Sequence, residues 1–497
     1  MKLPARAARQ YAPLGGQDYD SRVSGAPTVL VMAAGEGTRM RSSLPKVVHP
    51  VCGRPMVTWP VIAAREAGAG RIAVIVSPGH DLTPALPAGV ETVVQPQPDG
   101  TGGAVRAALD LVREADTVLV LSGDHPLVSS EILSTLLDTH RSVGAAATLM
   151  TTELDDPGSY GRVVRDADGQ VERIAEAKHP GDASPDELAI REINTGTYAF
   201  EAGPLADTLG RITNDNVAGE YYIGDVLPLL REAGHPIAAY RSADPGVNLG
   251  VNTRVELAEA NRQARRRVLE AHMLAGVTVI DPAATWIDAD VQIEPDATIE
   301  PACVLRGATR VGRDAVVGPL TTLIDTVLGA GAAARHSYLV ECDVLERCSV
   351  GPFAYIRPRT TLREGAKAGA FVEIKESDIG AGSKVPHLSY IGDAEIGEDT
   401  NIGAGSITAN WDGFRKHRTV IGDHVRISVD TALVAPVNVG DAAYTGAGSV
   451  ITRDVPPGAL GISRSDQHNV EGYAEKKARE ASRREEDEEV KRVETGQ

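Results

Sequence analysis

The chain has 497 residues, more than one hydrophobic core usually organises, so two or more domains are expected. Hydrophobic residues make up 42% and aromatic residues only 4%, which excludes a wholly disordered protein and leaves Val, Ile, Leu and Ala to build cores typical of parallel sheet. The formal net charge of −18 argues against binding to nucleic acid or an acidic membrane, but it does not exclude an anionic small-molecule substrate in a local basic pocket.

Residues 1–27 contain basic residues but no apolar run, so we expect a disordered extension and not a secretory signal. No apolar run in the chain approaches the roughly 18 residues of a membrane helix, so no membrane insertion is expected. The cysteines are too few and too scattered for a disulfide framework or a zinc site: Cys52, Cys303, Cys342 and Cys348. They are predicted to be reduced, as in a cytoplasmic protein.

Short apolar runs alternate with helical patterns in residues 28–251. Four runs are predicted to be buried strands: Thr28–Ala33, Arg71–Val76, Thr92–Gln95 and Thr117–Leu121. This alternation predicts an α/β, Rossmann-like domain with a parallel sheet, helices on both faces and ligands at the carboxyl ends of the strands. The segment Arg162–Ala177 has a turn sequence in its middle and is predicted to be an inserted hairpin.

A different pattern begins after residues 252–275, which contain no proline and are predicted to form a linker helix. Apolar residues then recur at every sixth position in three runs: Ile287, Ile293, Ile299, Leu305, Val311, Val317 and Leu323; Val350, Ile356, Leu362, Ala368 and Ile374; Ile421, Ile427, Leu433, Val439, Thr445 and Ile451. This period predicts a left-handed parallel β-helix of hexapeptide repeats over residues 276–473. The alternative is a chance alternation of Val and Ile in an ordinary sheet. The charged tail, residues 474–497, is expected to be a solvated helix or disordered.

A glycine-rich turn, AAGEGTRM at residues 33–40, follows the first predicted strand. Its glycines would let backbone amides approach a phosphate, and Arg39 and Lys46 would supply positive charge. The spacing matches neither the Walker loop nor the Rossmann dinucleotide fingerprint. Asp124 follows the carboxyl end of the predicted strand Thr117–Leu121, where a carboxylate is well placed to hold Mg²⁺ between phosphates. The alternative is an Asp that caps a turn or helix.

Some segments of the repeat region break its pattern and carry functional side chains: Arg357, Lys375, Lys416 and His387. A phosphate site needs converging cations. For any one of these cations the alternative is a solvated charge on the repeat surface, and for His387 alone it is a structural role.

Several motifs occur in an order that resembles sugar-1-phosphate nucleotidyltransferases: AAGEGTRM, LPK, Gln95 before GTG, SGDHP, YGR, EINTG and GVNTR. Together with the hexapeptide half, residues 28–473 resemble the family of bifunctional bacterial N-acetylglucosamine-1-phosphate uridylyltransferases/glucosamine-1-phosphate acetyltransferases. The resemblance implies that the enzyme acetylates glucosamine-1-phosphate with acetyl-CoA. It then transfers uridylyl from UTP to N-acetylglucosamine-1-phosphate and releases pyrophosphate. It further implies a role in peptidoglycan synthesis, a cytoplasmic location, Mg²⁺ as cofactor and a homotrimer.

The resemblance assigns residues of the first site as follows. Arg39 and Lys46 are catalytic and act on the UTP phosphates, and Asp124 and Asn252 hold Mg²⁺. The remaining contacts to UTP and the sugar nucleotide come from Ala33, Ala34, Gly35, Gln95, Gly100, Thr101, Gly161, Glu176 and Asn194. Because a sugar phosphate already carries a nucleophilic oxygen, the reaction needs alignment and charge neutralisation but no nucleophilic side chain. Gly103 stands where a larger polar residue is common in the family.

For the second site the resemblance makes His387 the general base that deprotonates the attacking amine, a role that suits a group titrating near neutrality. It assigns glucosamine-1-phosphate binding to Arg357, Lys375, Tyr390, Asn401 and Lys416. It assigns acetyl-CoA binding to Ala404, Asn410, Trp411, Val429, Ala447 and Arg464, with the site formed between chains of the trimer. Val429 replaces the usual serine, Trp411 replaces a tyrosine, and Arg359 stands where glycine is frequent.

Two other functions remain open from the sequence. One is a single-function sugar-1-phosphate nucleotidyltransferase in which the β-helix serves only as a trimerisation scaffold. The altered Val429 and Trp411 favour it, whereas the intact set around His387 argues against it. The other is a protein that senses nucleotide sugars without turnover, which the retained Arg39 and Asp124 argue against.

Overall fold

The computed structural model describes residues 25–495. The chain falls into two units, of which the first ends at Gly331 and the second begins at Ala332. The disordered extension predicted over residues 1–27 lies outside the described residues except for residues 25–27.

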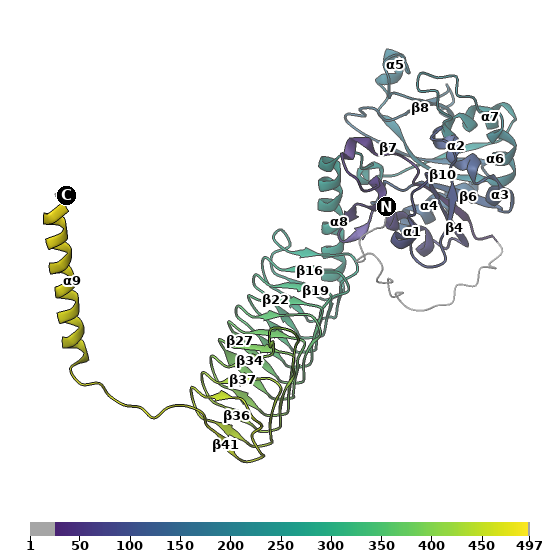
Figure 1. Ribbon diagram of the computed structural model, residues 1–497. Helices are drawn as coiled ribbons and strands as arrows, with labels where there is room; N and C mark the ends of the chain where they lie inside the picture. Colours follow the sequence, from purple (N-terminus) through teal and green to yellow (C-terminus); the bar gives the residue numbers. More distant parts are fainter. Residues whose placement is uncertain (1–24, 496–497) are drawn as a thin grey trace. The chain divides into compact units, whose positions relative to one another are not determined.

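A nine-stranded sheet forms the centre of the first unit, and its main strands follow the order β11-β7-β10-β6-β1-β4-β5 (Figure 1). Their bounds are Thr28–Met32 (β1), Arg71–Val76 (β4), Glu91–Val94 (β5), Thr117–Ser122 (β6), Ala147–Glu153 (β7), Glu192–Glu201 (β10) and Ile237–Arg241 (β11). All four predicted strands are present, with ends shifted by at most one residue.

One strand departs from the predicted parallel sheet. Strands β1, β4, β5 and β6 are parallel, but β10 pairs antiparallel with both β6 and β7. Between β7 and β10 the chain forms the predicted hairpin, β8 (Arg162–Arg165) and β9 (Val171–Ala175), and then the four-residue helix α5 (Pro185–Leu188). A parallel return needs a crossover helix, and none lies here, so β10 runs back in the opposite direction.

Helices cover both faces of this sheet, as predicted. Alternate strand residues point to opposite faces: Leu30 and Val120 belong to one core, Val31 and Leu121 to the other. The first core is completed by α2 (Thr101–Ala107), α3 (Leu109–Arg113), α6 (Ala202–Leu209) and α7 (Val226–Glu232), the second by α1 (Thr58–Glu66) and α4 (Ser130–Val143). Shorter elements are β2 (Pro50–Val51), β3 (Arg54–Pro55) and the 3₁₀ turns Thr38–Met40, Lys46–Val48, Thr83–Ala85, Ile223–Asp225 and Pro245–Asn248.

The long helix predicted over residues 252–275 is α8 (Arg254–Leu274). A capping box begins it: Thr253 Oγ1 accepts from the Glu256 backbone N–H, and the Glu256 carboxylate accepts from the Thr253 backbone N–H. Apolar residues of α8 pack with Cys52 and Trp286 in a third core, and the Ala289 backbone N–H donates to Cys52 O at 2.8 Å.

The six-residue period gives strands of two to four residues in three parallel sheets, the architecture of the predicted left-handed β-helix (Figure 1). In the first unit the strands are β12 (Thr278–Val279), β13 (Trp286–Ile287), β14 (Gln292–Ile293), β15 (Thr298–Ile299), β16 (Val304–Arg306), β17 (Arg310–Val311), β18 (Val316–Val317), β19 (Thr322–Ile324) and β20 (Val327–Leu328).

The remaining short strands lie in the second unit and also form three sheets. One sheet has β21 (Ala333–Ala334), β24 (Ser349–Val350), β27 (Lys367–Ala370), β30 (Lys384–His387), β33 (Asn401–Ile402), β36 (Arg426–Ile427), β39 (Tyr444–Thr445) and β41 (Leu460–Gly461). The next has β22 (Tyr338–Val340), β25 (Tyr355–Ile356), β28 (Glu373–Lys375), β31 (Tyr390–Gly392), β34 (Ile407–Ala409), β37 (Ala432–Val434) and β40 (Val450–Ile451). The third has β23 (Cys342–Val344), β26 (Thr360–Leu362), β29 (Asp378–Ile379), β32 (Ala394–Ile396), β35 (Thr419–Ile421) and β38 (Val437–Val439).

The residues predicted to point into the β-helix are buried, apart from the half-buried Ile293. The chance-alternation alternative is therefore wrong, because an ordinary sheet would not bury one residue in six along three runs. Of the two states left open for the tail, the structure has a helix, α9 (Tyr473–Thr495). No helix between residues 25 and 495 has the length and apolar composition needed to span a membrane.

Candidate active sites

The first site is built where β1 and β6 end. Backbone hydrogen bonds of 2.8 Å hold the loops together: Ala33 N–H donates to Ile75 O, and Gly123 N–H donates to Met32 O. A Cβ at Gly123 would lie 3.0 Å from Met32 O, so glycine lets the two loops come close. The predicted phosphate loop and the Asp124 turn therefore lie side by side at the carboxyl edge of the sheet.

Lys46 is buried between the two predicted metal ligands, Asp124 and Asn252. Its Nζ lies 2.5 Å from Asp124 Oδ2 and 2.9 Å from Asn252 Oδ1. The backbone N–H of Asn252 donates to the Glu256 carboxylate at 2.8 Å, so the α8 capping box fixes its position. Two oxygens from distant parts of the chain thus converge on one cationic nitrogen.

Electrostatics keep Asp124 ionised. Burial by itself would raise its pKa, but His125 and Lys46 outweigh it and hold the pKa well below the usual range. His125 Nδ1 lies 2.9 Å from Asp124 Oδ1. Sequence analysis assigned no role to His125, which directly follows the predicted ligand Asp124.

The phosphate loop presents its charge to solvent. Gly37 has φ of 62°, and a Cβ there would lie 2.5 Å from Lys46 Cβ, so the loop packs tightly on this lysine. Arg39 is exposed and forms no ion pair with any residue from 25 to 495. Ala33 and Ala34 are buried beneath the loop, and Gly35 is exposed.

The predicted base-reading residues lie beside the neighbouring strands. The Gln95 backbone N–H donates to Val76 O at 2.9 Å, and its side chain is buried. Gln95 Nε2 donates to Asp99 Oδ1 at 2.8 Å and to Gly100 O at 3.1 Å. Thr101 Oγ1 accepts from the Ile223 backbone N–H at 3.0 Å, which ties this turn to the segment before α7.

The predicted sugar-binding residues form a second group in this unit. The Asn194 backbone N–H donates to Gly161 O at 2.9 Å, and a Cβ at Gly161 would lie 3.7 Å from Glu176 Oε1. Asn194 Nδ2 lies 2.6 Å from the Tyr198 hydroxyl. Sequence analysis missed Asp225, whose pKa is raised to about 6 by burial and then by the charge of Glu176. A single carboxylate after YYIG carries no signal in the sequence.

In the second unit, the strand register aligns His387 with several of the predicted coenzyme-binding residues. Four residues pair in register on successive strands: Lys384, Asn401, Arg426 and Tyr444. The residue three positions after each of them is, in the same order, His387, Ala404, Val429 and Ala447. Backbone bonds continue this column: Asp430 donates to Ala404 O at 2.8 Å and Gly448 to Val429 O at 2.9 Å. Arg464 Nη1 donates to Ala447 O at 2.9 Å. His387 is exposed at the head of a column that is otherwise small or apolar.

Two of the three predicted phosphate-binding cations, Lys375 and Lys416, converge on Glu376, which sequence analysis did not single out. Its carboxylate lies 2.8 Å from Lys375 Nζ, 3.3 Å from Lys416 Nζ and 2.6 Å from Arg359 Nη2. Hydrogen bonds from Lys375 and Arg359 lower its pKa to about 2. The ion pair with Glu376 accounts for the unusual Arg359, which adds a third cation to this group. Arg357 Nη1 pairs separately with Glu373 Oε1 at 2.6 Å.

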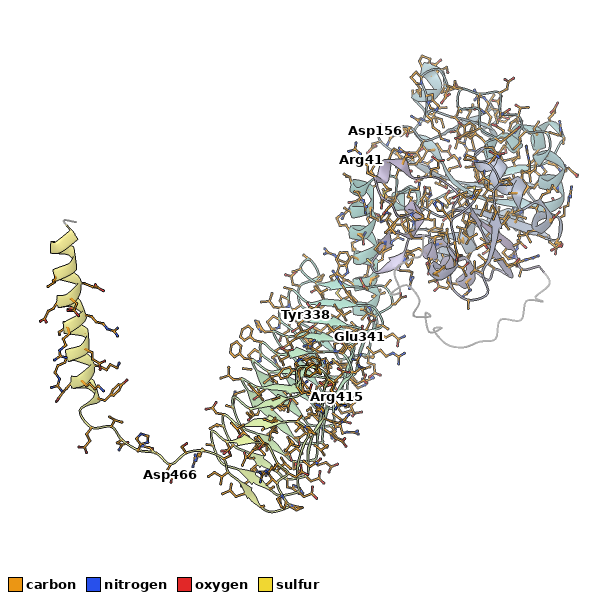
Figure 2. All side chains as sticks on the ribbon, viewed as in Figure 1. Arg41, Asp156, Tyr338, Glu341, Arg415 and Asp466 are labelled. Atoms are coloured by element: carbon orange, nitrogen blue, oxygen red, sulfur yellow. The ribbon has the colours of Figure 1, made fainter. Side chains whose placement is uncertain are left out.

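Of the other residues predicted for this site, Asn410 and Trp411 lie near Tyr390 and Lys416, whereas Asn401 lies elsewhere. Asn410 Nδ2 lies 3.3 Å from the Tyr390 hydroxyl and also contacts Asp393. Trp411 is exposed in a loop that leaves the coils and bridges back to Lys416; Arg415 marks this loop in Figure 2. Asn401, however, pairs with Lys384 at the start of β30, away from the His387 end. Within this chain it is not brought to the cations.

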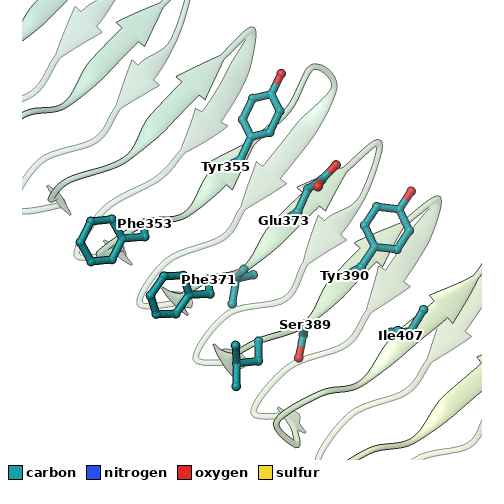
Figure 3. A pocket seen from close by; sticks show the side chains of 9 residues that line it. Phe353, Tyr355, Phe371, Glu373, Ser389, Tyr390 and Ile407 are labelled. Carbon is teal, nitrogen blue, oxygen red and sulfur yellow. The ribbon is translucent and has the colours of Figure 1, made fainter. Parts of the chain in front are cut away.

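A pocket of about 410 Å³ opens beside these residues (Figure 3). Figure 3 shows Tyr355, Glu373 and Tyr390 on successive coils along it, with Phe353 and Phe371 at the neighbouring corner. The rings of Phe353 and Phe371 stack at 5.3 Å. With Leu388 they form an apolar corner whose three side chains are 57%, 60% and 64% exposed.

Comparisons with known proteins cover nearly the whole chain. A family model described as a MobA-like NTP transferase domain matches residues 29–269. A bifunctional protein GlmU from Streptomyces avermitilis is 49% identical over 456 residues, which span 90% of this chain and 94% of that protein. Proteins of the same name are 50% identical over 451 residues in Kineococcus radiotolerans, spanning 90% and 91%, and 45% identical over 463 residues in Mycobacterium tuberculosis, spanning 91% and 93%.

The chain belongs to the GlmU family. This membership confirms the predicted bifunctional enzyme, a uridylyltransferase joined to an acetyltransferase, together with its Rossmann-like nucleotidyltransferase half. It also implies nucleotide and acyl-CoA substrates.

Proposed function

We propose that the first unit transfers uridylyl from UTP to N-acetylglucosamine-1-phosphate at the edge where Lys46, Asp124 and Asn252 meet. The phosphate oxygen of the sugar attacks the α-phosphorus of UTP, and pyrophosphate leaves. Lys46 and Arg39 neutralise charge on the triphosphate, and their cations matter most as charge builds on the leaving group. The observation that supports this assignment is the pair of contacts from Lys46 Nζ to the two ligand oxygens, at 2.5 and 2.9 Å.

Asp124 and Asn252 are the residues we propose to hold Mg²⁺. Carboxylate and amide oxygens are ligands that Mg²⁺ favours, and the ion takes its other ligands from water and phosphates. Among residues 25–495 no group of three His, Cys, Asp or Glu side chains could hold a metal by itself, so the nucleotide must complete the site. When bound there, the ion would neutralise charge on the phosphates.

The base and the sugar are proposed to bind on either side of this centre. Gln95, Gly100 and Thr101 contact uracil. Gly161, Glu176 and Asn194 hold N-acetylglucosamine-1-phosphate, and the hydrogen bonds that link Asn194 to Gly161 and Tyr198 support their acting together.

In the second unit His387 is proposed to take a proton from the amine of glucosamine-1-phosphate as that amine attacks the thioester of acetyl-CoA. Lys375, Lys416 and Arg357 bind the sugar phosphate, which competes with Glu376 and Glu373 for these cations. Tyr390 and Asn401 complete the sugar site. The coenzyme is bound by Ala404, Asn410, Trp411, Val429, Ala447 and Arg464. The strand register that aligns His387 with Ala404, Val429 and Ala447 supports this assignment.

We further propose that the chain forms a homotrimer in the cytoplasm, where it supplies cell-wall precursor. The apolar corner formed by Phe353, Phe371 and Leu388 is an exposed apolar patch, and such patches mark interaction surfaces. The apolar corner repeats once per coil, so a second copy with the same repeat would match it, and Asn401 would reach the site of a neighbouring chain. Phe371→Asp should lower the mass measured by light scattering, whereas a protein that is monomeric before substitution would contradict the trimer.

One experiment tests both reactions. The purified protein is incubated with glucosamine-1-phosphate, acetyl-CoA, UTP and Mg²⁺, and the products are identified by mass spectrometry. UDP-N-acetylglucosamine is the expected product. The exposed Val429 in the coenzyme column favours a second candidate, a single-function nucleotidyltransferase, which would form the UDP-sugar only when N-acetylglucosamine-1-phosphate is supplied.

A further inference from the structure

The turn before α2 contains a contact that accounts for the unusual Gly103. A Cβ at Gly103 would overlap the carboxylate of Asp99, which occupies the space left by the missing side chain. The backbone of Asp99 is fixed as well, because its carbonyl accepts from the Tyr221 N–H at 2.8 Å while Gly102 N–H donates to Tyr221 O at 2.7 Å. Asp99 and Gly103 therefore form a matched pair on a rigid turn.

The carboxylate of Asp99 determines what Gln95 can offer a ligand. Gln95 Nε2 has two hydrogens, and its two partners, Asp99 Oδ1 at 2.8 Å and Gly100 O at 3.1 Å, use both. Neither a carboxylate nor a backbone carbonyl can donate, so the amide cannot turn over without losing both bonds. Only the oxygen Oε1 remains to face a ligand, and it accepts but does not donate.

We propose that Asp99 is a positioning residue that selects uracil through Gln95, an inference that rests on the proposed place of Gln95 at the base. The N3 atom of uracil carries a hydrogen that the fixed Oε1 accepts. Cytosine presents an unprotonated N3 at the same place, and two acceptors then face each other. A base with the wrong hydrogen-bond pattern leaves polar groups unpaired, which is a strong source of discrimination.

The test compares kcat/KM for UTP and CTP in four variants. Asp99→Ala frees the amide of Gln95, and the preference for UTP over CTP should fall about tenfold, as expected for one misplaced hydrogen bond. Gly103→Ala should cause the same fall, because the new Cβ displaces the Asp99 carboxylate. The substitution should not unfold α2, since alanine favours helix more than glycine does. Asp99→Asn keeps an acceptor oxygen and should retain most of the preference.

Two further comparisons separate positioning from a general structural role. The double variant Asp99→Ala/Gly103→Ala should lose no more preference than Asp99→Ala alone, because both changes act through one contact. The ratio for UTP over 5-methyl-UTP, which keeps the N3 hydrogen, should stay unchanged throughout. An unchanged UTP/CTP ratio in Asp99→Ala and Gly103→Ala, or additive losses in the double variant, would overturn the inference alone. A starting protein that turns over no UTP would contradict the proposed function itself.

Discussion

The ammonium nitrogen of Lys46 lies 2.5 Å from Asp124 Oδ2, where the two side chains are mostly shielded from solvent. The same nitrogen also contacts Asn252, so a cation of the protein holds the two proposed metal ligands together. Removing one partner of such a pair leaves the other charge without compensation. The contact thus links the charge of the proposed metal site to Lys46, the proposed phosphate-binding lysine.

Asp124→Asn should abolish uridylyl transfer and leave acetyl transfer intact, because the carboxylate supplies charge to only one of the two sites. Separate assays of pyrophosphate release and thiol release from acetyl-CoA measure the two activities. Asp116→Asn, an exposed change at the opposite end of β6, serves as the control and should affect neither. Equal loss of both activities in a folded Asp124→Asn protein would refute independent sites.

Arg39→Ala should lower kcat for uridylyl transfer more than it raises KM for UTP. Its charge is expected to act most strongly as negative charge develops on the departing pyrophosphate. Steady-state kinetics with varied UTP measure both constants. The exposed neighbour Arg41 provides the matched control, Arg41→Ala. A raised KM with unchanged kcat would mean that Arg39 binds ground state and transition state equally.

His387→Ala should reduce acetyl transfer by about 10²–10⁴-fold and spare uridylyl transfer, since a general base contributes on that scale. The measurement is thiol release at saturating acetyl-CoA. His424→Ala, an exposed change on a later coil, is the control. Acetyl transfer that survives in His387→Ala at the starting rate would exclude His387 as the base.

Val429→Ser should lower the KM for acetyl-CoA and change kcat little, because restoring one hydrogen bond of about 0.5–1.5 kcal/mol strengthens ground-state and transition-state binding alike. Val429 is 47% exposed, so the substitution should not disturb the core. The same change at the exposed Val255 on α8 should leave this KM as it was. If neither protein transfers acetyl groups at millimolar acetyl-CoA, the single-function alternative replaces the bifunctional assignment.

Asp225→Asn should change how stability depends on pH. Burial and Glu176 raise the pKa of Asp225 to about 6 in the folded protein, above the value of about 3.9 expected when unfolded. The folded state therefore holds the proton of Asp225 more strongly, so the contribution of Asp225 to stability is fully present below about pH 4 and is lost as pH rises through 6. Asp225→Asn has no carboxyl group at this position, so it lacks this loss of stability with rising pH.

Melting temperatures between pH 4 and pH 7 measure the effect. The Tm of Asp225→Asn relative to the starting protein should rise across this range, while the exposed Asp215→Asn should show no such trend. A constant difference between Asp225→Asn and the starting protein would mean that Asp225 titrates normally.

The sequence by itself determined which residues are buried and where loops begin. The six-residue period identified the inward positions of the β-helix, and four apolar runs identified strands of the sheet, because the side chain that faces a core depends on local backbone geometry. It also predicted roles for Arg39, Lys46 and Asp124, since glycine-rich loops and strand ends have local signatures. It did not predict the antiparallel β10, which depends on how the chain returns after the hairpin.

Only the tertiary structure decided which of these residues meet. Lys46 and Asn252 are 206 residues apart, and their contact depends on the order of the strands and on where α8 begins. Glu376 contacts three cations, and His387 aligns with the proposed coenzyme-binding residues, because the coils stack in one register. Asp99 lies close to Gly103 in the sequence, yet its effect on Gln95 is visible only from the fixed turn against Tyr221. Hydrogen bonds and ion pairs depend on distance and direction in space, which no periodic pattern specifies.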